Sequence, residues 1–354
     1  MVIIFAILAF GILIAVHELG HFFAAKAFGV KVEEFALGMG PAILKKQGKE
    51  TLYTLRPLPI GGFCAMEGED EAVDSPRSFS AQKPWKRAII LCAGAAMNFV
   101  VGFILVLCIA PMTAGFVEPV IDSFMDGCPY VGENAIMEGD RIYSVDGHRT
   151  FFTEHVTQYL RRSGGEHHDI VLIRDGHRVK LDDFYMVPVE YEQPDGSSIY
   201  KYGFYFSPRE QGLWANIKYA WFGSLDFCRL VWDSLGMLVS GQVGIRDMSG
   251  PVGVVDLVND MTKEAESTKE AAFDFCYIFA LIAVNLAVMN MLPIPALDGG
   301  RVFFLIVTWI IEKISRRKLD PKYEGYIHTG AFVLLMAFMV FILFSDVLKA
   351  FFGV

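Results

Sequence analysis

Several features common in soluble and secreted proteins are missing from this sequence. Its 354 residues include only 6 cysteines and no CxxC pair, so neither a disulfide framework nor a cysteine metal site is predicted. The net charge of -9 is spread without a basic tract, and we therefore expect no nucleic-acid partner. No internal repeat or low-complexity tract appears. These absences exclude disulfide scaffolds, repeat proteins and nucleic-acid binders.

Charged side chains are also missing from four long stretches of the chain. Hydrophobic residues make up 53% of the sequence, and a helix of about 20 apolar residues spans a bilayer core of about 30 Å. The sequence therefore predicts a polytopic α-helical membrane protein with four transmembrane helices and membrane lipid around it. We place these helices at residues 1–28, 88–112, 273–297 and 329–350.

The first apolar run could instead be a cleaved secretory signal. No basic residue precedes residues 1–16, however, and polar chemistry begins directly after them. Both features disfavour a signal peptide. We expect residues 1–28 to remain as the first transmembrane helix.

The distribution of Lys and Arg predicts the orientation. Ten lie between residues 26 and 87 and six between 301 and 322, against fourteen in the much longer stretch 111–273. Short basic loops stay in the cytoplasm, whereas long domains cross the membrane largely regardless of charge. We expect a multi-pass inner or plasma membrane protein whose two termini and central domain lie outside the cytoplasm.

Three connecting segments are long enough to have structure of their own. Alternating residues within 29–87 predict a cytoplasmic, membrane-associated β-segment or, equally, a small folded loop. Residues 115–208 combine short strands, Asp-Gly turns and a helical stretch near 154–162, which predicts an inserted extracytoplasmic α+β domain. Aromatic residues mixed with charges predict an amphipathic interfacial region at 212–262. Residues 298–328 are expected to form a cytoplasmic interfacial segment.

The first apolar run leads into the motif His17-Glu18-Leu19-Gly20-His21. On a helix the two histidines lie about 6 Å apart along the axis and on one face, so both imidazoles can reach one ion. Imidazole suits zinc, and the intervening Glu18 could deprotonate a water on the metal. Ionisable side chains inside a bilayer cost about 2.5 to 3.5 kcal/mol each, and a metal would compensate them. Alternatively, the three are ordinary helix-end residues at the interface.

Asp298 is the candidate for a third ligand, because a catalytic zinc usually takes three protein ligands. It lies in the sequence Asn-Met-Leu-Pro-Ile-Pro-Ala-Leu-Asp-Gly-Gly, residues 290–300. Prolines and glycines interrupt a membrane helix where the backbone lines a site. Asp298 could instead cap a following helix at 302–311.

Together these residues resemble the site-2 protease family, the M50 type of intramembrane zinc metalloprotease. The resemblance is carried by the HELGH motif, by NMLPIPALDGG, and by residues 137–147, which resemble the signature of a PDZ domain. Residues 38–40, 61–63 and 249–251 also match family segments. The nearest group is the bacterial type with one PDZ-like domain.

The resemblance implies one zinc ion per chain, bound by His17, His21 and Asp298, with Glu18 as general base. It also implies that Asn290 binds substrate backbone, although Asn290 could instead join two helices. The family's usual proline is Ala95 here, which leaves the role of Asn98 open. The role of Asn285 is open as well. The family's hydrophobic residue and lysine before Met66 are replaced by Cys64-Ala65, so the β-segment could hold substrate differently.

The activity implied is regulated intramembrane proteolysis of transmembrane segments, for example those of anti-sigma factors or remnant signal peptides. The substrates would be trimmed beforehand by another protease. Two alternatives are a catalytically silent scaffold, which has no need of Glu18, and a metal transporter, which would need a second site. The other histidines lie mostly in the central domain, where His167 and His168 fit a solvated turn better than a metal site.

Overall fold

The computed structural model describes residues 2–69, 73–113, 118–162, 164–192, 198–207, 212–242, 267–315 and 321–352. The chain divides into two units. Unit 1 comprises Met1–Val106 and Phe227–Val354, and unit 2 comprises Leu107–Asp226.

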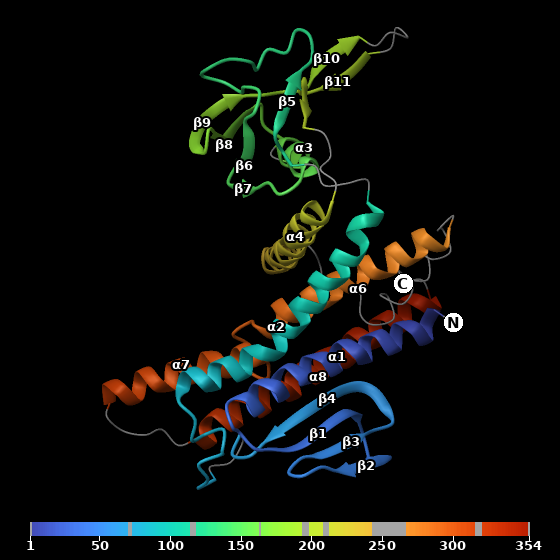
Figure 1. Ribbon diagram of the computed structural model, residues 1–354, viewed down its shortest axis with the longest axis vertical. Coiled ribbons are helices and arrows are strands. Elements are labelled where there is room, and N and C mark those ends of the chain that lie inside the picture. Colours follow the sequence, from blue (N-terminus) through green and yellow to red (C-terminus); the bar gives the residue numbers. More distant parts are fainter. Residues whose placement is uncertain are drawn as a thin grey trace. The chain divides into compact units, whose positions relative to one another are not determined.

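Unit 1 is built mainly from long helices (Figure 1): α1 (Val2–Ala27), α2 (Pro84–Ile109), α6 (Thr268–Asn290), α7 (Asp298–Ser315) and α8 (Pro321–Phe352). Four segments of the described chain are long and apolar enough to cross a membrane: Leu8–Ala27, Pro84–Met112, Thr268–Asn290 and Gly325–Ile342. The predicted four transmembrane helices are therefore confirmed.

The third of these helices ends earlier than the sequence predicts. Helix α6 stops at Asn290 rather than at residue 297. Pro293 and Pro295 lie in the turn that follows, and proline has no N–H to donate to a continuing helix. The apolar sequence continues through residue 297, but the backbone has already left the helix.

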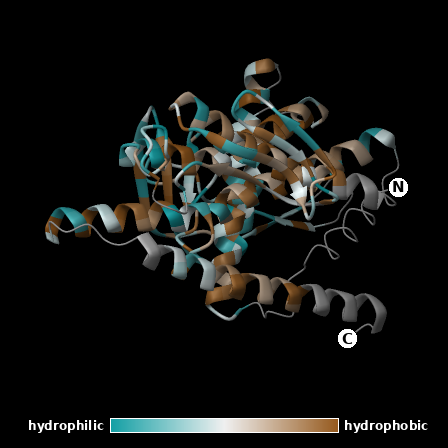
Figure 2. Cartoon of the chain, turned by 90° about the horizontal axis from the view of Figure 1, so that it is seen from below, coloured by the Kyte–Doolittle hydropathy of each residue, from teal (hydrophilic) through white to brown (hydrophobic). Residues whose placement is uncertain are grey.

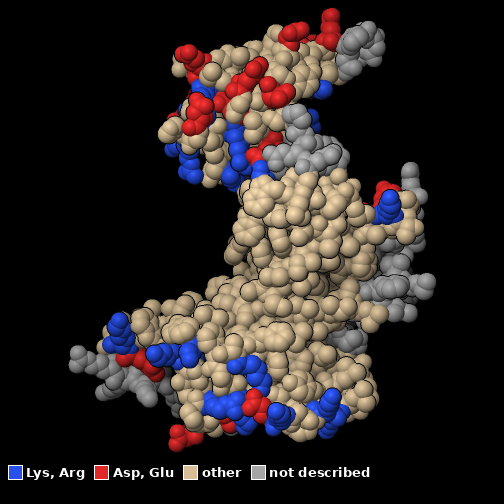
Figure 3. All heavy atoms as spheres, in the orientation of Figure 1, with Lys and Arg blue, Asp and Glu red and all other residues tan. Residues whose placement is uncertain are grey.

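Apolar side chains cover the outside of these helices. Phe332, Val333 and Leu334 of α8 are 50%, 62% and 69% exposed, and the middle of α8 is coloured mainly hydrophobic in Figure 2. In Figure 3 the Lys and Arg residues of unit 1 gather mainly over its β-sheet, while its helices show a largely uncharged surface. Such a surface is stable when lipid covers it.

The sheet of unit 1 contains β1 (Val32–Met39), β2 (Leu44–Gln47), β3 (Leu52–Leu55) and β4 (Leu58–Met66). The strand order is β2-β3-β1-β4. Strand β1 runs parallel to β3 and antiparallel to β4. The predicted β-segment is confirmed, and β4, at one edge of this sheet, lies along α1 (Figure 1).

One buried core joins the sheet to the two helices beside it. Ala25 of α1, Val32 and Phe35 of β1, and Ile90 of α2 are all buried in this cluster. Full burial of one Val, Phe or Ile side chain contributes roughly 1.5 to 3 kcal/mol to the stability of the fold. The packing therefore fixes the C-terminal half of α1 against α2 and the sheet.

Unit 2 contains short strands and one helix: β5 (Ile121–Phe124), β6 (Arg141–Val145), β7 (His148–Arg149), α3 (Thr153–Arg162), β8 (His167–Arg174), β9 (His177–Tyr185), β10 (Val189–Glu192), β11 (Ser198–Lys201) and β12 (Phe204–Phe206). They form a four-stranded sheet, β7-β6-β8-β9, and the pairs β12-β5 and β10-β11. These small sheets are consistent with the predicted PDZ-like insert. The unit also contains the start of helix α4 (Leu213–Val239), which begins the region predicted to be interfacial.

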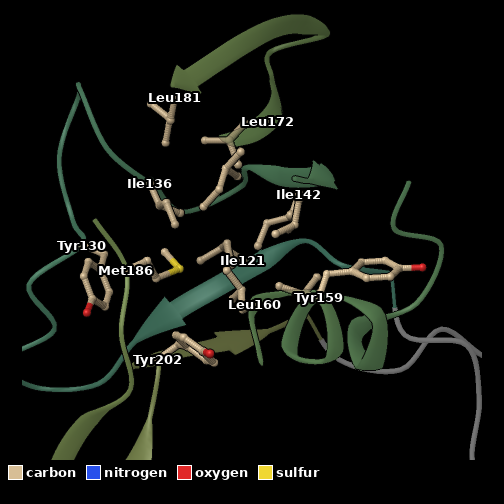
Figure 4. Close-up of a cluster of buried hydrophobic side chains, with 13 residues drawn as sticks. Ile121, Tyr130, Ile136, Ile142, Tyr159, Leu160, Leu172, Leu181, Met186 and Tyr202 are labelled. Atoms are coloured by element: carbon tan, nitrogen blue, oxygen red, sulfur yellow. The ribbon is translucent and has the colours of Figure 1, made fainter. Parts of the chain in front are cut away.

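The core of unit 2 lies between α3 and the strands (Figure 4). Ile121 of β5, Ile142 of β6 and Leu160 of α3 are 1%, 1% and 3% exposed, and they meet in this cluster. At the turn between β6 and β7, Asp146 and Gly147 have φ values of 49° and 78°. An Asp-Gly pair in which both residues have positive φ is typical of the two-residue turns that connect the strands of β-hairpins.

A buried ion pair fixes the Gly-Asp turn within the PDZ-like signature. Asp140 is fully buried, with 0% exposure. Its carboxylate accepts hydrogen bonds from Nε and Nη2 of Arg174 at 2.8 and 2.7 Å and from the backbone N–H of Met137 at 2.8 Å. The signature therefore has a structural explanation inside the unit. The matching stretch 249–251 lies outside the described residues.

Candidate metal centre

The structure brings together the three predicted metal ligands from two helices. His17 and His21 lie one turn apart on α1, and Asp298 is the first residue of α7. The Oδ2 atom of Asp298 lies 3.1 Å from Nε2 of His17 and 3.3 Å from Nε2 of His21. The two Nε2 atoms are 3.2 Å apart. Three potential ligand atoms therefore form a nearly equilateral triangle.

This triangle has the dimensions of one face of a tetrahedral zinc site. Zn–N and Zn–O bonds of about 2.0 to 2.1 Å place neighbouring ligands roughly 3.3 Å apart. The Nδ1–H of His21 donates to the carbonyl oxygen of Ile90 at 2.8 Å. The Nε2 atom of His21 therefore presents a lone pair to Asp298, as metal-binding histidines do. Two acceptors at this distance repel each other unless a cation lies between them, so the donor set fits a metal.

A glycine on α2 provides the space beside the two imidazoles. A Cβ atom at Gly94 would lie 2.3 Å from Nε2 of His21 and 2.8 Å from Nε2 of His17. The helices themselves also approach closely, since a Cβ at Gly20 would lie 2.3 Å from the carbonyl oxygen of Ala93. Both positions must lack a side chain for α2 to face the ligand atoms.

Two asparagines lie beside the other ring nitrogen of His17. The Nδ2 atoms of Asn98 and Asn290 lie 3.4 and 3.5 Å from Nδ1 of His17. Among the described residues, the buried Oδ1 atom of Asn98 accepts no hydrogen bond. A turned amide would place that oxygen where it accepts the Nδ1–H of His17, since the O and N positions of an amide are interchangeable.

Sequence reasoning left Asn98 out of the site, and the structure places it next to a ligand. The available signal was that Asn98 is the only strongly polar residue in the apolar stretch 89–112. Asn290, predicted to bind substrate, lies at the same histidine. Asn285 is exposed on α6.

The turn before Asp298 packs directly against the first turn of α7. A Cβ at Gly299 would lie 2.3 Å from the carbonyl oxygen of Met291, and one at Gly300 would lie 2.1 Å from that of Ile294. The Gly-Gly pair therefore lets backbone meet backbone at this point. Asp298 lies in the first turn of α7, and its carboxylate lies beside both histidines.

Contacts from two other segments, α8 and the loop at Glu69, hold this turn and α7. Ala296 has a φ of 78°, a conformation that costs a residue with a side chain about 1 to 3 kcal/mol. Its backbone N–H donates to Nδ1 of His328 on α8 at 2.9 Å. The His328 ring also contacts the edge of Phe304. On α7, Arg301 forms an ion pair with Glu69.

Glu18 lies between the ligand cluster and the edge strand β4. A Cβ at Gly62 would lie 3.1 Å from Cγ of Glu18, and the Glu18 carboxylate faces the backbone amide of Cys64. Burial, together with the Glu18 charge, raises the pKa of the Cys64 thiol to about 12. The side chain expected to act as base is therefore held where the sheet meets α1.

Two other histidines, His155 and His168 of unit 2, have carboxylate partners. His168 lies 2.8 Å from Oδ2 of Asp146 through its Nδ1 atom, and His155 lies 3.3 Å from Asp226. Within the part of the chain that the structure describes, His17, His21 and Asp298 are the one group of three side chains placed to share a metal ion.

The fold and this cluster define a class of protein: a polytopic membrane metallohydrolase with a His, His, Asp ligand set and a neighbouring glutamate. Residues 5–338 match the profile of peptidase family M50. The chain belongs to this family and is a multi-pass membrane peptidase. The chain is a zinc metalloprotease of this family, and the donor set of the cluster fits a zinc ion.

Relatives of similar length support the assignment. The chain is 35% identical to a Clostridium acetobutylicum protein, provisionally named a zinc metalloprotease, over 98% of this chain and 97% of the relative. It is 26% identical to the zinc metalloprotease RasP of Bacillus licheniformis, over 98% of each chain. It is 25% identical to the regulator of sigma-W protease RasP of Bacillus subtilis, also over 98% of each chain.

Proposed function

We propose that this chain hydrolyses peptide bonds within transmembrane segments, using His17, His21 and Asp298 as zinc ligands and Glu18 as general base. The chain is an intramembrane zinc metalloprotease that acts on membrane proteins. The observation that carries the residue roles is the triangle of ligand atoms, 3.1 to 3.3 Å on a side, formed across α1 and α7.

The chain's own residues divide the work of hydrolysis. When bound, zinc supplies Lewis-acid polarisation of the scissile carbonyl and lowers the pKa of water toward about 7. Glu18 takes the proton of the attacking water and returns it to the leaving amine. Asn98 and Asn290 keep the His17 ring in its orientation, and Asn290 also binds the substrate backbone.

We propose that substrate reaches the site as an extended strand. A helical backbone buries its carbonyl groups in hydrogen bonds, so the substrate must unwind before attack. Strand β4 is an edge strand of its sheet and lies along α1 next to Glu18. Peptides commonly add to such an edge by backbone hydrogen bonding.

The orientation and the substrate class extend this proposal. The basic loops at residues 26–87 and 301–322 favour a site near the cytoplasmic side and a PDZ-like domain outside the cytoplasm. That domain excludes substrates whose outer parts have not been trimmed by another protease. The name of the Bacillus subtilis relative, a regulator of sigma-W protease, favours regulated intramembrane proteolysis. We propose anti-sigma factors or remnant signal peptides as substrates, as the family resemblance implies.

The test compares wild-type protein with Glu18→Gln in detergent or liposomes. Zinc content and cleavage of a single-span model substrate are measured for both, with Glu33→Gln, an exposed glutamate on β1, as the matched control. We expect about one zinc per chain in all three proteins and cleavage by wild type and the control alone. Absent zinc together with no cleavage by the wild type would instead favour the silent scaffold, and cleavage unchanged by Glu18→Gln would refute Glu18 as the base.

A further inference from the structure

We propose that His328 is a positioning residue, which holds the turn at Ala296 and thereby directs Asp298 toward His17 and His21. This inference rests on the proposed function, because it takes Asp298 as a metal ligand. His328 lies on α8, the last helix of the chain, thirty residues beyond the ligand it positions.

The contact is a specific one between a ring nitrogen and a backbone amide. The N–H of Ala296 donates to Nδ1 of His328 at 2.9 Å. The imidazole packs against the ring of Phe304 on α7 in a T-shaped contact, with ring centroids 5.3 Å apart and planes at 66°. His328 therefore contacts both segments that flank Asp298, the turn before it and the helix after it.

The backbone conformation of the turn at Ala296 is strained, and a contact from another segment would stabilise it. Ala296 has a φ of 78°, in the left-handed region that favours glycine. Strained residues persist when surrounding contacts over-determine their conformation. The accepted N–H of Ala296 is one such contact, and it would be lost if the residue turned to an ordinary conformation.

A change in this turn is transmitted to the ligand. The carbonyl oxygens of Met291 and Ile294 lie against Gly299 and Gly300, with no space for a Cβ atom at either glycine. The turn and the first turn of α7 therefore move together. Metal sites tolerate ligand displacements of only about 0.2 Å, so even a small relaxation of the turn weakens zinc binding.

The acceptor function of His328 can be separated from its size. Asparagine carries its Oδ1 atom as many bonds from the backbone as the Nδ1 atom of histidine, so His328→Asn can still accept the Ala296 N–H. His328→Leu has comparable bulk but no acceptor. Thr329→Ala changes an exposed neighbour on the same helix and serves as the matched control.

The experiment measures the zinc dissociation constant of the full-length apo-protein by chelator competition. We expect His328→Leu to weaken binding about 10- to 100-fold, as loss of an outer contact of a metal site commonly does. His328→Asn should bind within about threefold of wild type, and Thr329→Ala should be unchanged. The absorption spectrum of the cobalt-substituted protein should change in His328→Leu alone, because it reports ligand geometry.

A second variant gives the test a result even if His328→Leu folds poorly. Glycine adopts positive φ without strain, so Ala296→Gly makes the turn less dependent on its partner. In that background, His328→Leu should weaken zinc binding less than about threefold, and the two substitutions should be non-additive. Equal effects in both backgrounds would overturn the inference.

Two further results would also overturn it: wild-type zinc affinity in His328→Leu, or equal weakening in the Leu and Asn variants. Asp298→Asn separates this failure from failure of the proposed function. If Asp298→Asn loses zinc while His328→Leu keeps it, only the positioning role is refuted. If Asp298→Asn keeps zinc, the ligand assignment itself is wrong.

Discussion

Adding one methyl group at Gly94 should abolish zinc binding without weakening the helix that carries it. In Gly94→Ala the new Cβ would lie 2.3 Å from Nε2 of His21 and 2.7 Å from Cε1 of His17. Ordinary van der Waals contact begins at 3.4 Å, so the new Cβ and the His21 ring must separate by 1.1 Å, the difference between 3.4 and 2.3 Å, to reach it.

That displacement is several times the roughly 0.2 Å that a metal site tolerates. We expect the zinc dissociation constant to rise at least about 100-fold, which corresponds to about 2.8 kcal/mol of binding free energy. The intrinsic helix preference has the opposite sign, since alanine is favoured over glycine by about 1 kcal/mol in a helix interior. If Gly94→Ala loses zinc, unfolding of helix α2 is therefore not the cause.

The assay is zinc content and dissociation constant, with cleavage and far-ultraviolet circular dichroism on the same samples. Ala96→Gly, an exposed position two residues along α2, is the matched control. Ala96→Gly lowers the intrinsic stability of α2 by about 1 kcal/mol. It adds no atom near the histidines and should retain zinc and activity. Wild-type zinc affinity in Gly94→Ala would refute the placement of α2 against the two imidazoles.

Three further results are expected. Gly299→Ala should lower zinc affinity about 10- to 100-fold, measured by chelator competition, because its Cβ would lie 2.3 Å from the carbonyl group of Met291. Iodoacetamide should label Cys64 slowly at pH 8 and fast only as the pH approaches 12, because burial and the Glu18 charge raise its thiol pKa to about 12; fast labelling at pH 8 would contradict this. Arg174→Ala should destabilise unit 2 by about 3 to 5 kcal/mol, read as faster amide hydrogen exchange in its strands, because Asp140 is left buried without its partner.

Much of the fold followed from local patterns. Long uncharged runs predicted four membrane helices, because a single physical requirement, the thickness of the apolar bilayer core, sets their length. Asp-Gly pairs predicted turns, and the structure has positive φ at Asp146 and Gly147. The end of α6 was placed too late because hydropathy continues through residue 297, while the prolines had already ended the helix.

The site was predictable to the extent that its residues sit in short motifs. His17, Glu18 and His21 are one helical turn, so their spacing alone places both imidazoles on one face. Asp298 was inferred from a break in an apolar run and from a family resemblance. The contribution of Asn98 could not be weighed, because nothing in the sequence says which face of α2 meets α1.

The sequence by itself determined the class of chemistry, since the residue types and their spacing within one helix specify a zinc-binding hydrolase motif in a membrane span. Only the tertiary structure decided which distant atoms complete it. Gly94 opens the space, Asn98 reaches His17, and His328 meets the turn before Asp298. These contacts join segments far apart in the chain. Whether they form depends on how helices pack in three dimensions, which no local pattern specifies.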